Sequence, residues 1–545
     1  MQGNRFHLFS GARRLFVIIA LMALGVVLAA PTPLIPKSRA VLATATPSLS
    51  VQGYLAPGDT VRVNGGQFIP GETVTLSYDA TAFATVVVRQ RMGITGSQLG
   101  TFSASFTVPT STTTGSHTFS AVAQPSGLTA QSAVTVNANW AQYGFTPTNT
   151  RLNPYETAIN ATNVSQLTVA WTFTATNVGM FSYNIPSVHD GSIYFSTIAN
   201  NTTYRRNAST GASIWSVVSD NFPAGPQAPA ISSSAISTLY TTGYYLNAFW
   251  ASSGAMRWGT TTTYTVDDAP TLANGFVYVT TGGSLAAFHA DGCGQWWCTA
   301  AWQYTDSLGS IVGTPAVANG LVYVGTTTGK LIVVDASTGV LQWVGTIATG
   351  DQFGPGAPVV DNGMVFIATG GLYASNSTLY AFPAAGCGSA TCAPTWSAAV
   401  SQQFGIGAAV NLAVANGTIF VSSTDWHLYA FSESGCGSAT CAPIWAGQTA
   451  GKIESAPAVA NGVVYVGSYD DGAINAFNAS GCGAATCAPI WTHTLGENVQ
   501  GGPIVVNGMV YITSRHSLYA FHLPAASMAG RACHRGQSKH SLRAC

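Results

Sequence analysis

Charged side chains are scarce in this chain of 545 residues. Asp, Glu, Lys and Arg together make up 7% of it, whereas soluble domains usually carry roughly 25%. The 19 acidic and 19 basic residues balance to a net charge of zero, and no segment forms a basic domain. This balance excludes nucleic acid as a main partner, and the 59 glycines exclude a coiled coil. The 47% of hydrophobic residues and the 13 tryptophans exclude a disordered chain.

Long apolar runs are also scarce, and the one that occurs stands near the N-terminus. Three arginines precede a 16-residue apolar run from Leu15 to Ala30. This length is short for a bilayer span and is typical of the core of a secretory signal. Several small residues leave the cleavage position open, and an uncleaved anchor through residues 15–30 is the alternative. We assign residues 1–45 to a signal peptide or N-terminal anchor plus linker, and expect an exported protein, secreted or held at the cell surface.

Cysteine is rare, but eight of its ten copies form pairs with one spacing, C-G-x-x-x-C. Zinc sites usually use C-x2-C pairs, two of which converge on one ion. These pairs instead have four intervening residues and stand on separate repeats of the chain. The spacing therefore predicts local disulfides, which support export, and each stabilises the fold by roughly 2 kcal/mol. The predicted disulfides are Cys293–Cys298, Cys387–Cys392, Cys436–Cys441 and Cys482–Cys487.

From residue 170 onward one unit recurs, and it predicts the fold of most of the chain. Each copy has two β-rich runs joined by a tight-turn dipeptide, then a run such as L-Y-A-F, a turn and a Trp. The turns are Asp190-Gly191, a degenerate Ser233-Ser234, Asn274-Gly275, Asn319-Gly320, Asn362-Gly363, Asn416-Gly417, Asn461-Gly462 and Asn507-Gly508. Their spacing of 41 to 54 residues is about one four-stranded propeller blade.

Eight tryptophans run in phase with these turns: Trp171, Trp215, Trp258, Trp302, Trp343, Trp396, Trp445 and Trp491. We therefore predict an all-β chain with an eight-bladed β-propeller over residues 139–523. Aromatic residues that recur in every blade indicate packing between blades rather than a cofactor site. The last repeat ends after its third strand, and the first Trp strand, residues 166–175, has no partners of its own. We expect these two fragments to pair and to close the ring.

The two segments that flank the propeller differ from it and from each other. Residues 46–138 alternate short Val- and Thr-rich runs with Gly and Pro turns, which predicts a β-sandwich. It resembles the Ig-like modules of bacterial surface proteins in its F-x-P-G-E-x-V motif, residues 68–74. The basic tail, residues 524–545, carries Cys533 and Cys545, whose pairing stays open. We expect this tail to be disordered, with a basic anchoring patch as the alternative.

The repeat resembles the PQQ-like (quinoprotein-type) β-propeller family. Residues 335–343, DASTGVLQW, are similar to the family's Asp-x-x-Thr-Gly-x-x-x-Trp turn, and residues 140–171 look like its lead-in segment. The resemblance implies a propeller that serves both dehydrogenases and non-catalytic scaffolds. In a dehydrogenase it implies pyrroloquinoline quinone (PQQ) held over the axis beside a calcium ion, often against a disulfide between adjacent cysteines. This chain has no adjacent cysteines and no long insertion with clustered carboxylates.

One register position singles out candidate binding residues. The residue three before the proline that opens each inner strand is expected to line one rim of the axial channel. At this position Asp267, Glu454 and Gln500 could bind a cation or a polar ligand; alternatively, they are solvated loop residues. We predict no catalytic residue, metal site or cofactor.

The function that the sequence favours is an exported or cell-surface binding or scaffold module without catalytic activity. Its ligand would be a protein or a surface glycan, and a purely structural spacer is not separable from a binding module by sequence. The alternative is a PQQ-dependent dehydrogenase that oxidises alcohols or sugars.

Overall fold

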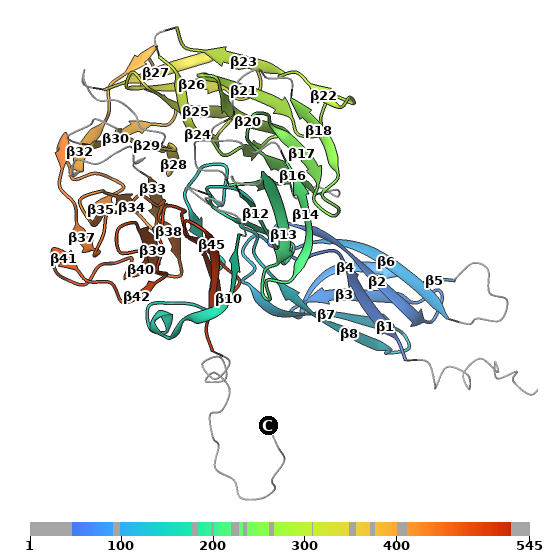
Figure 1. Ribbon diagram of the computed structural model, residues 1–545. Coiled ribbons are helices and arrows are strands. Elements are labelled where there is room, and N and C mark those ends of the chain that lie inside the picture. Colours follow the sequence, from blue (N-terminus) through green and yellow to red (C-terminus); the bar gives the residue numbers. More distant parts are fainter. Residues whose placement is uncertain are drawn as a thin grey trace, which may run out of the picture.

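The chain is built almost entirely from β-strands (Figure 1). The computed structural model describes residues 46–90, 99–175, 184–197, 201–219, 228–232, 237–260, 266, 268–307, 309–347, 356–370, 377–400 and 411–524. The apolar run of residues 15–30 and the tail with Cys533 and Cys545 lie outside these residues. No helix in the described ranges has the length and apolarity needed to cross a membrane.

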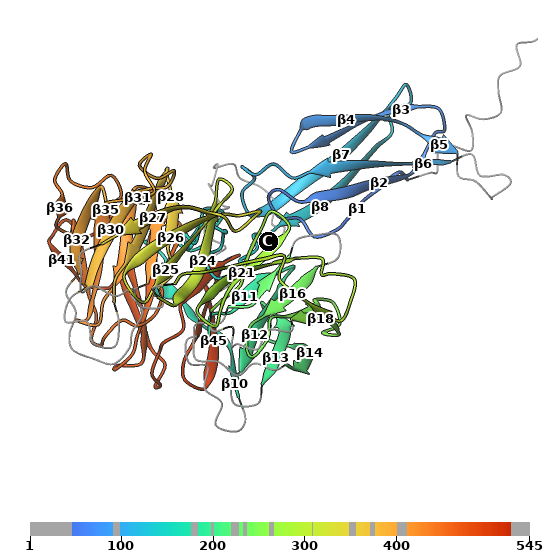
Figure 2. The same ribbon diagram turned by 90° about the horizontal axis from the view of Figure 1, so that it is seen from above.

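The N-terminal strands form two four-stranded sheets that share one core, which is a β-sandwich. Alternate side chains of β2 (Thr60–Phe68) are buried, as expected for a strand with one face on the core. The first sheet has the order β1 (Ser48–Gln52), β2, β6 (Gly100–Thr107), β5 (Arg89–Gln90). The second has the order β4 (Thr81–Val87), β3 (Thr73–Tyr78), β7 (Gly115–Gln124), β8 (Thr129–Val136). Figure 2 shows this sandwich projecting from the side of a ring of further sheets.

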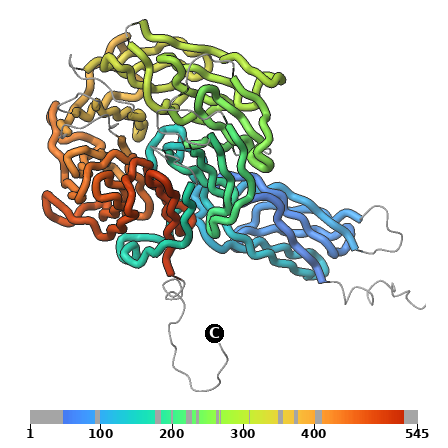
Figure 3. Tube along the Cα trace, in the orientation of Figure 1, coloured from blue at the N-terminus to red at the C-terminus, as the bar shows by residue number. Residues whose placement is uncertain are grey.

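The ring contains eight sheets within the described residues, each with four antiparallel strands (Figure 3). The first four blades are β11–β14 (Ser187–His189, Ser192–Thr197, Thr202–Asn207, Ser213–Val218), β15–β18 (Ala230–Ile231, Thr238–Thr241, Asn247–Trp250, Met256–Thr260), β19, β20, β21 and β23 (Thr271–Ala273, Phe276–Thr281, Ser284–His289, Trp302–Thr305) and β24–β27 (Ile311–Ala318, Leu321–Thr326, Lys330–Asp335, Leu341–Thr346).

The next three blades are β28, β29, β30 and β32 (Val359–Asp361, Met364–Ala368, Ser377–Pro383, Trp396–Val400), β33, β34, β35 and β37 (Leu412–Ala415, Thr418–Ser422, His427–Ser432, Trp445–Gln448) and β38, β39, β40 and β42 (Ala458–Ala460, Val463–Ser468, Ala473–Asn478, Trp491–Thr494). The eighth joins β43–β45 (Ile504–Val506, Met509–Thr513, Ser517–His522) to β10 (Thr168–Thr174), which follows the short 3-10 helix η3 (Val164–Gln166). The predicted all-β propeller class is confirmed.

Tight turns join the first and second strands of the blades where the sequence predicts them. In all seven described turns both residues have positive φ, for example 50° at Asn319 and 77° at Gly320. These angles belong to a two-residue hairpin turn, which Asn-Gly adopts with little strain. The eighth predicted turn, Ser233-Ser234, lies outside the described residues.

The predicted closure of the ring is confirmed. β10 pairs antiparallel with β45, from Thr168 opposite His522 to Thr174 opposite Ser517. The hydroxyl groups of Thr174 and Ser517 lie 3.0 Å apart at one end of this pair. In Figure 1 the teal β10 lies beside the red β45, so the two ends of the propeller sequence complete one blade. Closure removes two open sheet edges.

The recurring tryptophans pack between blades, as predicted. Seven of the eight lie against a glycine of the next blade, in the turn between its third and fourth strands. A Cβ on any of these glycines would lie 2.5 to 2.9 Å from the indole ring, so only glycine allows the contact. The pairs are Trp171–Gly211, Trp215–Gly254, Trp258–Gly292, Trp302–Gly339, Trp343–Gly386, Trp396–Gly435 and Trp445–Gly481.

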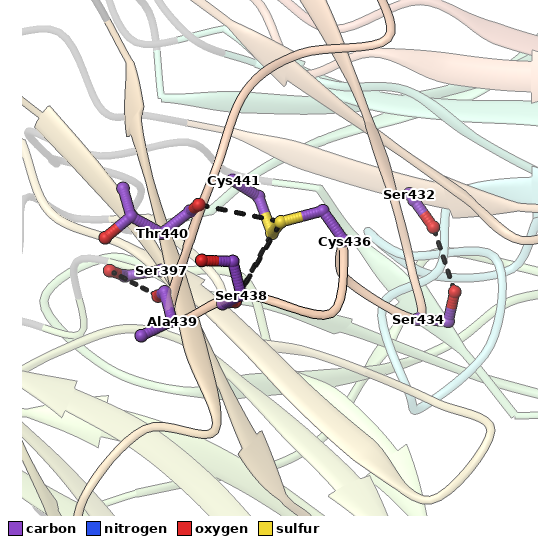
Figure 4. Close-up of a disulfide and its surroundings, with 8 residues drawn as sticks. All are labelled: Ser397, Ser432, Ser434, Cys436, Ser438, Ala439, Thr440 and Cys441. Atoms are coloured by element: carbon purple, nitrogen blue, oxygen red, sulfur yellow. Dashed lines mark hydrogen bonds between the residues drawn. A yellow bond between two sulfur atoms is a disulfide. The ribbon is translucent and has the colours of Figure 1, made fainter.

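All four predicted disulfides are present, each with a Cα–Cα distance of 5.7 Å. Each disulfide closes a loop between the third and fourth strands of its blade, and this loop has a second role. Each loop contributes a short parallel strand to the outer edge of the preceding blade. Figure 4 shows one such loop, Cys436–Cys441, with Ala439 next to Ser397 of the neighbouring blade. The added strands are β22 (Trp297–Cys298), β31 (Thr391–Cys392), β36 (Thr440–Cys441) and β41 (Thr486–Cys487).

The lead-in segment, residues 140–153, connects to the innermost strand of every blade in turn. In six of the eight blades, an inner-strand amide donates a hydrogen bond to a backbone carbonyl of the segment, at 2.8 or 2.9 Å. The donors are Val188, Ile231, Val317, Val360, Val414 and Val459, and the acceptors are Trp140, Ala141, Pro147, Thr148, Thr150 and Arg151. In the other two blades, side chains of the segment make the connection. Gln142 accepts a hydrogen bond from the Leu272 amide, and Asn153 donates one to the Val505 carbonyl. β9 (Leu152–Asn153) also pairs with β38.

Two side chains of the lead-in segment bind carbonyls that the inner strands leave unpaired. The guanidinium of Arg151 is fully buried and donates to the carbonyls of Pro457, Tyr143 and Pro503 at 2.5 to 2.8 Å. Asn149 donates in the same way to the carbonyls of the prolines that open the fourth and fifth blades. Burial lowers the pKa of Arg151 to about 10, and Tyr143 opposes this shift. The side chain is still a cation at neutral pH, stabilised by carbonyl dipoles and by the rings of Trp140 and Tyr143.

We predict that Arg151→Met destabilises the propeller by about 3 kcal/mol or more, because it leaves the buried carbonyls of Pro457 and Pro503 without donors. Scanning calorimetry would detect this as a lower unfolding temperature. Arg89→Met, at an exposed position of the sandwich, is the control and should change the unfolding free energy by about 0.5 kcal/mol or less. Equal unfolding temperatures for the two variants would contradict this role of Arg151.

Candidate functional site

The structure brings together two of the three residues that the rim register predicts. Glu454 and Gln500 come just before the inner strands of neighbouring blades, and Gln500 donates a 2.9 Å hydrogen bond to the Glu454 carboxylate. Glu454 is only 3% exposed. The alternative interpretation, a solvated loop residue, is therefore wrong for Glu454. Asp267 lies outside the described residues.

A lysine neutralises the Glu454 carboxylate. The Nζ atom of Lys452 lies 2.7 Å from Glu454 Oε1, while its ammonium also lies 4.2 Å from the centre of the Tyr469 ring. Burial lowers the pKa of Lys452, but Glu454, with smaller contributions from Asp470 and Tyr469, raises it above its ordinary value. This rim cluster, Lys452, Glu454 and Gln500, is therefore an ion pair between a buried carboxylate and a partly exposed lysine, with an amide beside it.

The rim cluster is linked to the lead-in segment through one asparagine. Asn411 donates to the backbone carbonyl of Glu454 at 3.2 Å and accepts from the hydroxyl of Tyr143. Asp268, next to the predicted Asp267, is also engaged: it accepts from the hydroxyl of Thr280 and from the amide of Gly313 in the next blade. The polar groups near the axis thus bind one another and hold adjacent blades in register.

These residues do not fit a calcium ion. Calcium takes six to eight oxygen ligands, several of them anionic. In the described part of the chain no three His, Cys, Asp or Glu side chains form such a group. The carboxylate of Glu454 already has the ammonium group of Lys452 where a metal cation would bind. The carboxylate of Asp268 accepts two hydrogen bonds from the protein.

A hollow lies between the sandwich and the propeller, and it was not predicted from the sequence. Its volume is about 470 Å³. The sandwich and the propeller also contact directly: Ala138 exchanges two hydrogen bonds with the side chain of Asn507, and Thr114 donates to the Tyr155 carbonyl. This interdomain cleft is lined by residues that include Asp59 of the sandwich, Gln142 of the lead-in segment, and Tyr155, Tyr240, Phe276 and Asp291 of the propeller.

Acidic groups meet at this contact between the domains. Burial, with repulsion from Asp190, raises the pKa of Asp59 to about 6, although the Ala56 amide partly opposes the shift. Asp190 stands in the first tight turn of the propeller, 3.2 Å from the imidazole of His189. Burial, with Arg205 nearby, lowers the pKa of His189 to about 4, so this histidine is neutral at pH 7 and does not compensate Asp190. Two carboxylates therefore repel each other across the domain contact at neutral pH.

Comparisons with known proteins agree on the propeller repeat. A family model described as "Outer membrane protein assembly factor BamB" matches residues 219–434 and 387–482. A second, described as "Glucose/ethanol/alcohol dehydrogenase, beta-propeller domain", matches residues 140–242. No curated protein matches the sequence.

Solved structures of both kinds resemble the chain in fold. BamB from Moraxella catarrhalis superposes with a TM-score of 0.50 and 16% identity, covering 65% of this chain and 99% of its own. Quinohemoprotein alcohol dehydrogenases from Pseudomonas putida and Comamonas testosteroni each superpose with a TM-score of 0.53 and 14% identity. They cover 74% and 75% of this chain, and 82% and 83% of their own lengths. At these identities the likeness concerns the fold alone.

We predict that Asp59→Asn stabilises the protein at pH 7.5 by about 1 kcal/mol and has little effect at pH 4.5. The raised pKa means that the folded state takes up a proton as the pH falls through about 6, before the unfolded chain does. The charged Asp59 therefore lowers the free energy of unfolding above about pH 6, and this destabilisation disappears as the pH falls towards 4. The expected stabilisation is small because a half-buried carboxylate keeps part of its hydration.

The measurement is thermal unfolding of both proteins at the two pH values. Asp291→Asn, which neutralises a carboxylate on a side chain that is 90% exposed, is the control and should show no such pH dependence. A constant difference between wild type and Asp59→Asn at both pH values would contradict the assignment.

Proposed function

Since this chain belongs to the PQQ-like β-propeller repeat family, we propose that it is an exported or cell-surface binding or scaffold protein without catalytic activity. The observation that carries this proposal is the rim cluster. A calcium-dependent quinone site needs free carboxylates near the axis, whereas Glu454 is paired with Lys452 and hydrogen-bonded to Gln500. Its ligand would be a protein or a surface glycan.

The rigidity of the ring supports a scaffold role. The blades are joined by tryptophan–glycine contacts, by the closing pair β10–β45 and by the lead-in segment. A framework held in these ways keeps its outer loops at fixed separations, which suits binding sites that are already formed before the ligand arrives. The sandwich would then act as a spacer or as a second binding unit.

The four disulfides indicate an extracytoplasmic protein, because such bonds persist in oxidising compartments. We extend this to export through the N-terminal apolar run, with residues 15–30 either cleaved or kept as an anchor. If residues 15–30 are kept, they would anchor the protein in the membrane.

The test is to mix the purified protein with PQQ and calcium and to follow both absorbance and the reduction of an electron-accepting dye with ethanol or glucose. We expect no saturable change in the PQQ spectrum and no substrate-dependent dye reduction. The dehydrogenase alternative requires saturable binding with turnover that is lost in Glu454→Gln. Glu433→Gln, which alters a buried glutamate in an outer turn, is the control that should keep any such turnover.

A further inference from the structure

One of the four disulfide loops differs from the other three in its side chains. Three loops read C-G-S-A-T-C, C-G-S-A-T-C and C-G-A-A-T-C, whereas residues 293–298 read C-G-Q-W-W-C. The two tryptophans are exposed, Trp296 by 65% and Trp297 by 49%. Aromatic rings of this size are mostly buried in folded domains, so two adjacent exposed indoles mark a surface with a use outside the fold.

The fold does not need these tryptophans. In all four loops the residue before the added strand gives its carbonyl to an amide of the preceding blade, at 2.8 to 2.9 Å. In the first loop that residue is Trp296, which accepts from Gly259. In Figure 4 the same place is taken by Ala439, which accepts from Ser397 at 2.9 Å. Loops with alanine and threonine at these two positions thus form the same backbone hydrogen bond as the loop with two tryptophans.

Trp296 lines a hollow whose wall also carries polar side chains. Its volume is about 250 Å³, and its lining includes Trp296, Gln295, Arg257 and Asp291. The guanidinium of Arg257 is held in place by Trp250, 4.8 Å from its ring centre, and by the hydroxyl of Thr238. It lies 3.3 Å from the carboxylate of Asp291. The wall therefore offers fixed donors and acceptors with no net charge.

This hollow lies next to the interdomain cleft. Asp291 lines both, and the cleft adds Tyr240, Phe276, Tyr155 and Gln142. Trp297 extends the surface on the other side, where its ring lies 5.8 Å from that of Tyr245. Aromatic rings and polar side chains thus line both hollows, which together offer more room to an extended chain than either does alone.

We propose that this surface, the tryptophan groove, binds a neutral glycan chain. The apolar face of a sugar ring stacks on an indole, while its hydroxyl groups exchange hydrogen bonds with the carboxylate, guanidinium and amide groups around it. A balanced Arg257–Asp291 pair does not select a polyanion, and the two indoles expose far less area than a stable protein interface requires. The inference rests on the proposed binding function, for which it names the ligand class.

The test replaces the loop by the sequence of its relatives in the same chain. In the variant Q295S/W296A/W297T the loop reads C-G-S-A-T-C, which two blades already contain, so the unfolding temperature should match wild type. Binding is measured by titration calorimetry with neutral hexasaccharides of cellulose, xylan, mannan and chitin, and with hexasaccharides of polygalacturonate and heparin as charged probes. Wild type should bind at least one neutral probe, and the loop variant should bind it at least about tenfold more weakly.

The control is Trp426→Ala, which removes another exposed tryptophan, on the sixth blade, and should leave glycan affinity unchanged. The proposal is overturned if wild type binds no neutral probe, if it binds charged probes better, or if the loop variant binds as well as wild type. These outcomes are separate from the proposed function, which fails only if the wild-type protein turns over substrate with PQQ and calcium.

Discussion

The inner ring of the propeller depends on hydrogen bonds from a single short segment. The inner strands of the blades are only two to eight residues long, and their axis-facing amides and carbonyls have no further strand to pair with. Residues 140–153 supply these partners, blade after blade, through their own backbone and through Asn149, Arg151 and Asn153. Because an unpaired buried peptide group costs about 1–3 kcal/mol, these hydrogen bonds contribute substantially to the stability of the inner ring.

The same segment determines what the axis can do. It fills the end next to the tight turns with Arg151 and its carbonyl partners, and Tyr143 extends the network towards Asn411 and the backbone of Glu454. Polar groups along this path are engaged with one another rather than free for a metal or a quinone. Specific binding is therefore expected on the outer surface, where one copy of the repeat differs from the others, as the disulfide loop with Trp296 and Trp297 does.

Much of the fold follows from local chemistry and could be predicted from sequence. Asn-Gly turns, Trp spacing and Cys spacing each report on residues close together in the chain, so repeats, closing strand and disulfides were predictable. The environment of Glu454 was not, because a register position says nothing of the lysine two residues earlier that turns towards it. The raised pKa of Asp59 and the interdomain cleft require the relative placement of two domains, and the edge strands β22, β31, β36 and β41 require contacts between neighbouring blades.

The central claim is that the lead-in segment holds the inner strands, and residue-resolved hydrogen–deuterium exchange of the full chain tests it most directly. The amides of Val188, Ile231, Val317, Val360, Val414 and Val459 have their partners in this segment alone. They should exchange as slowly as ladder amides of the second strands, such as those of Val324 and Val466, because both open only when the ring unfolds. Exchange of the six inner amides orders of magnitude faster than that of the second strands would contradict the account.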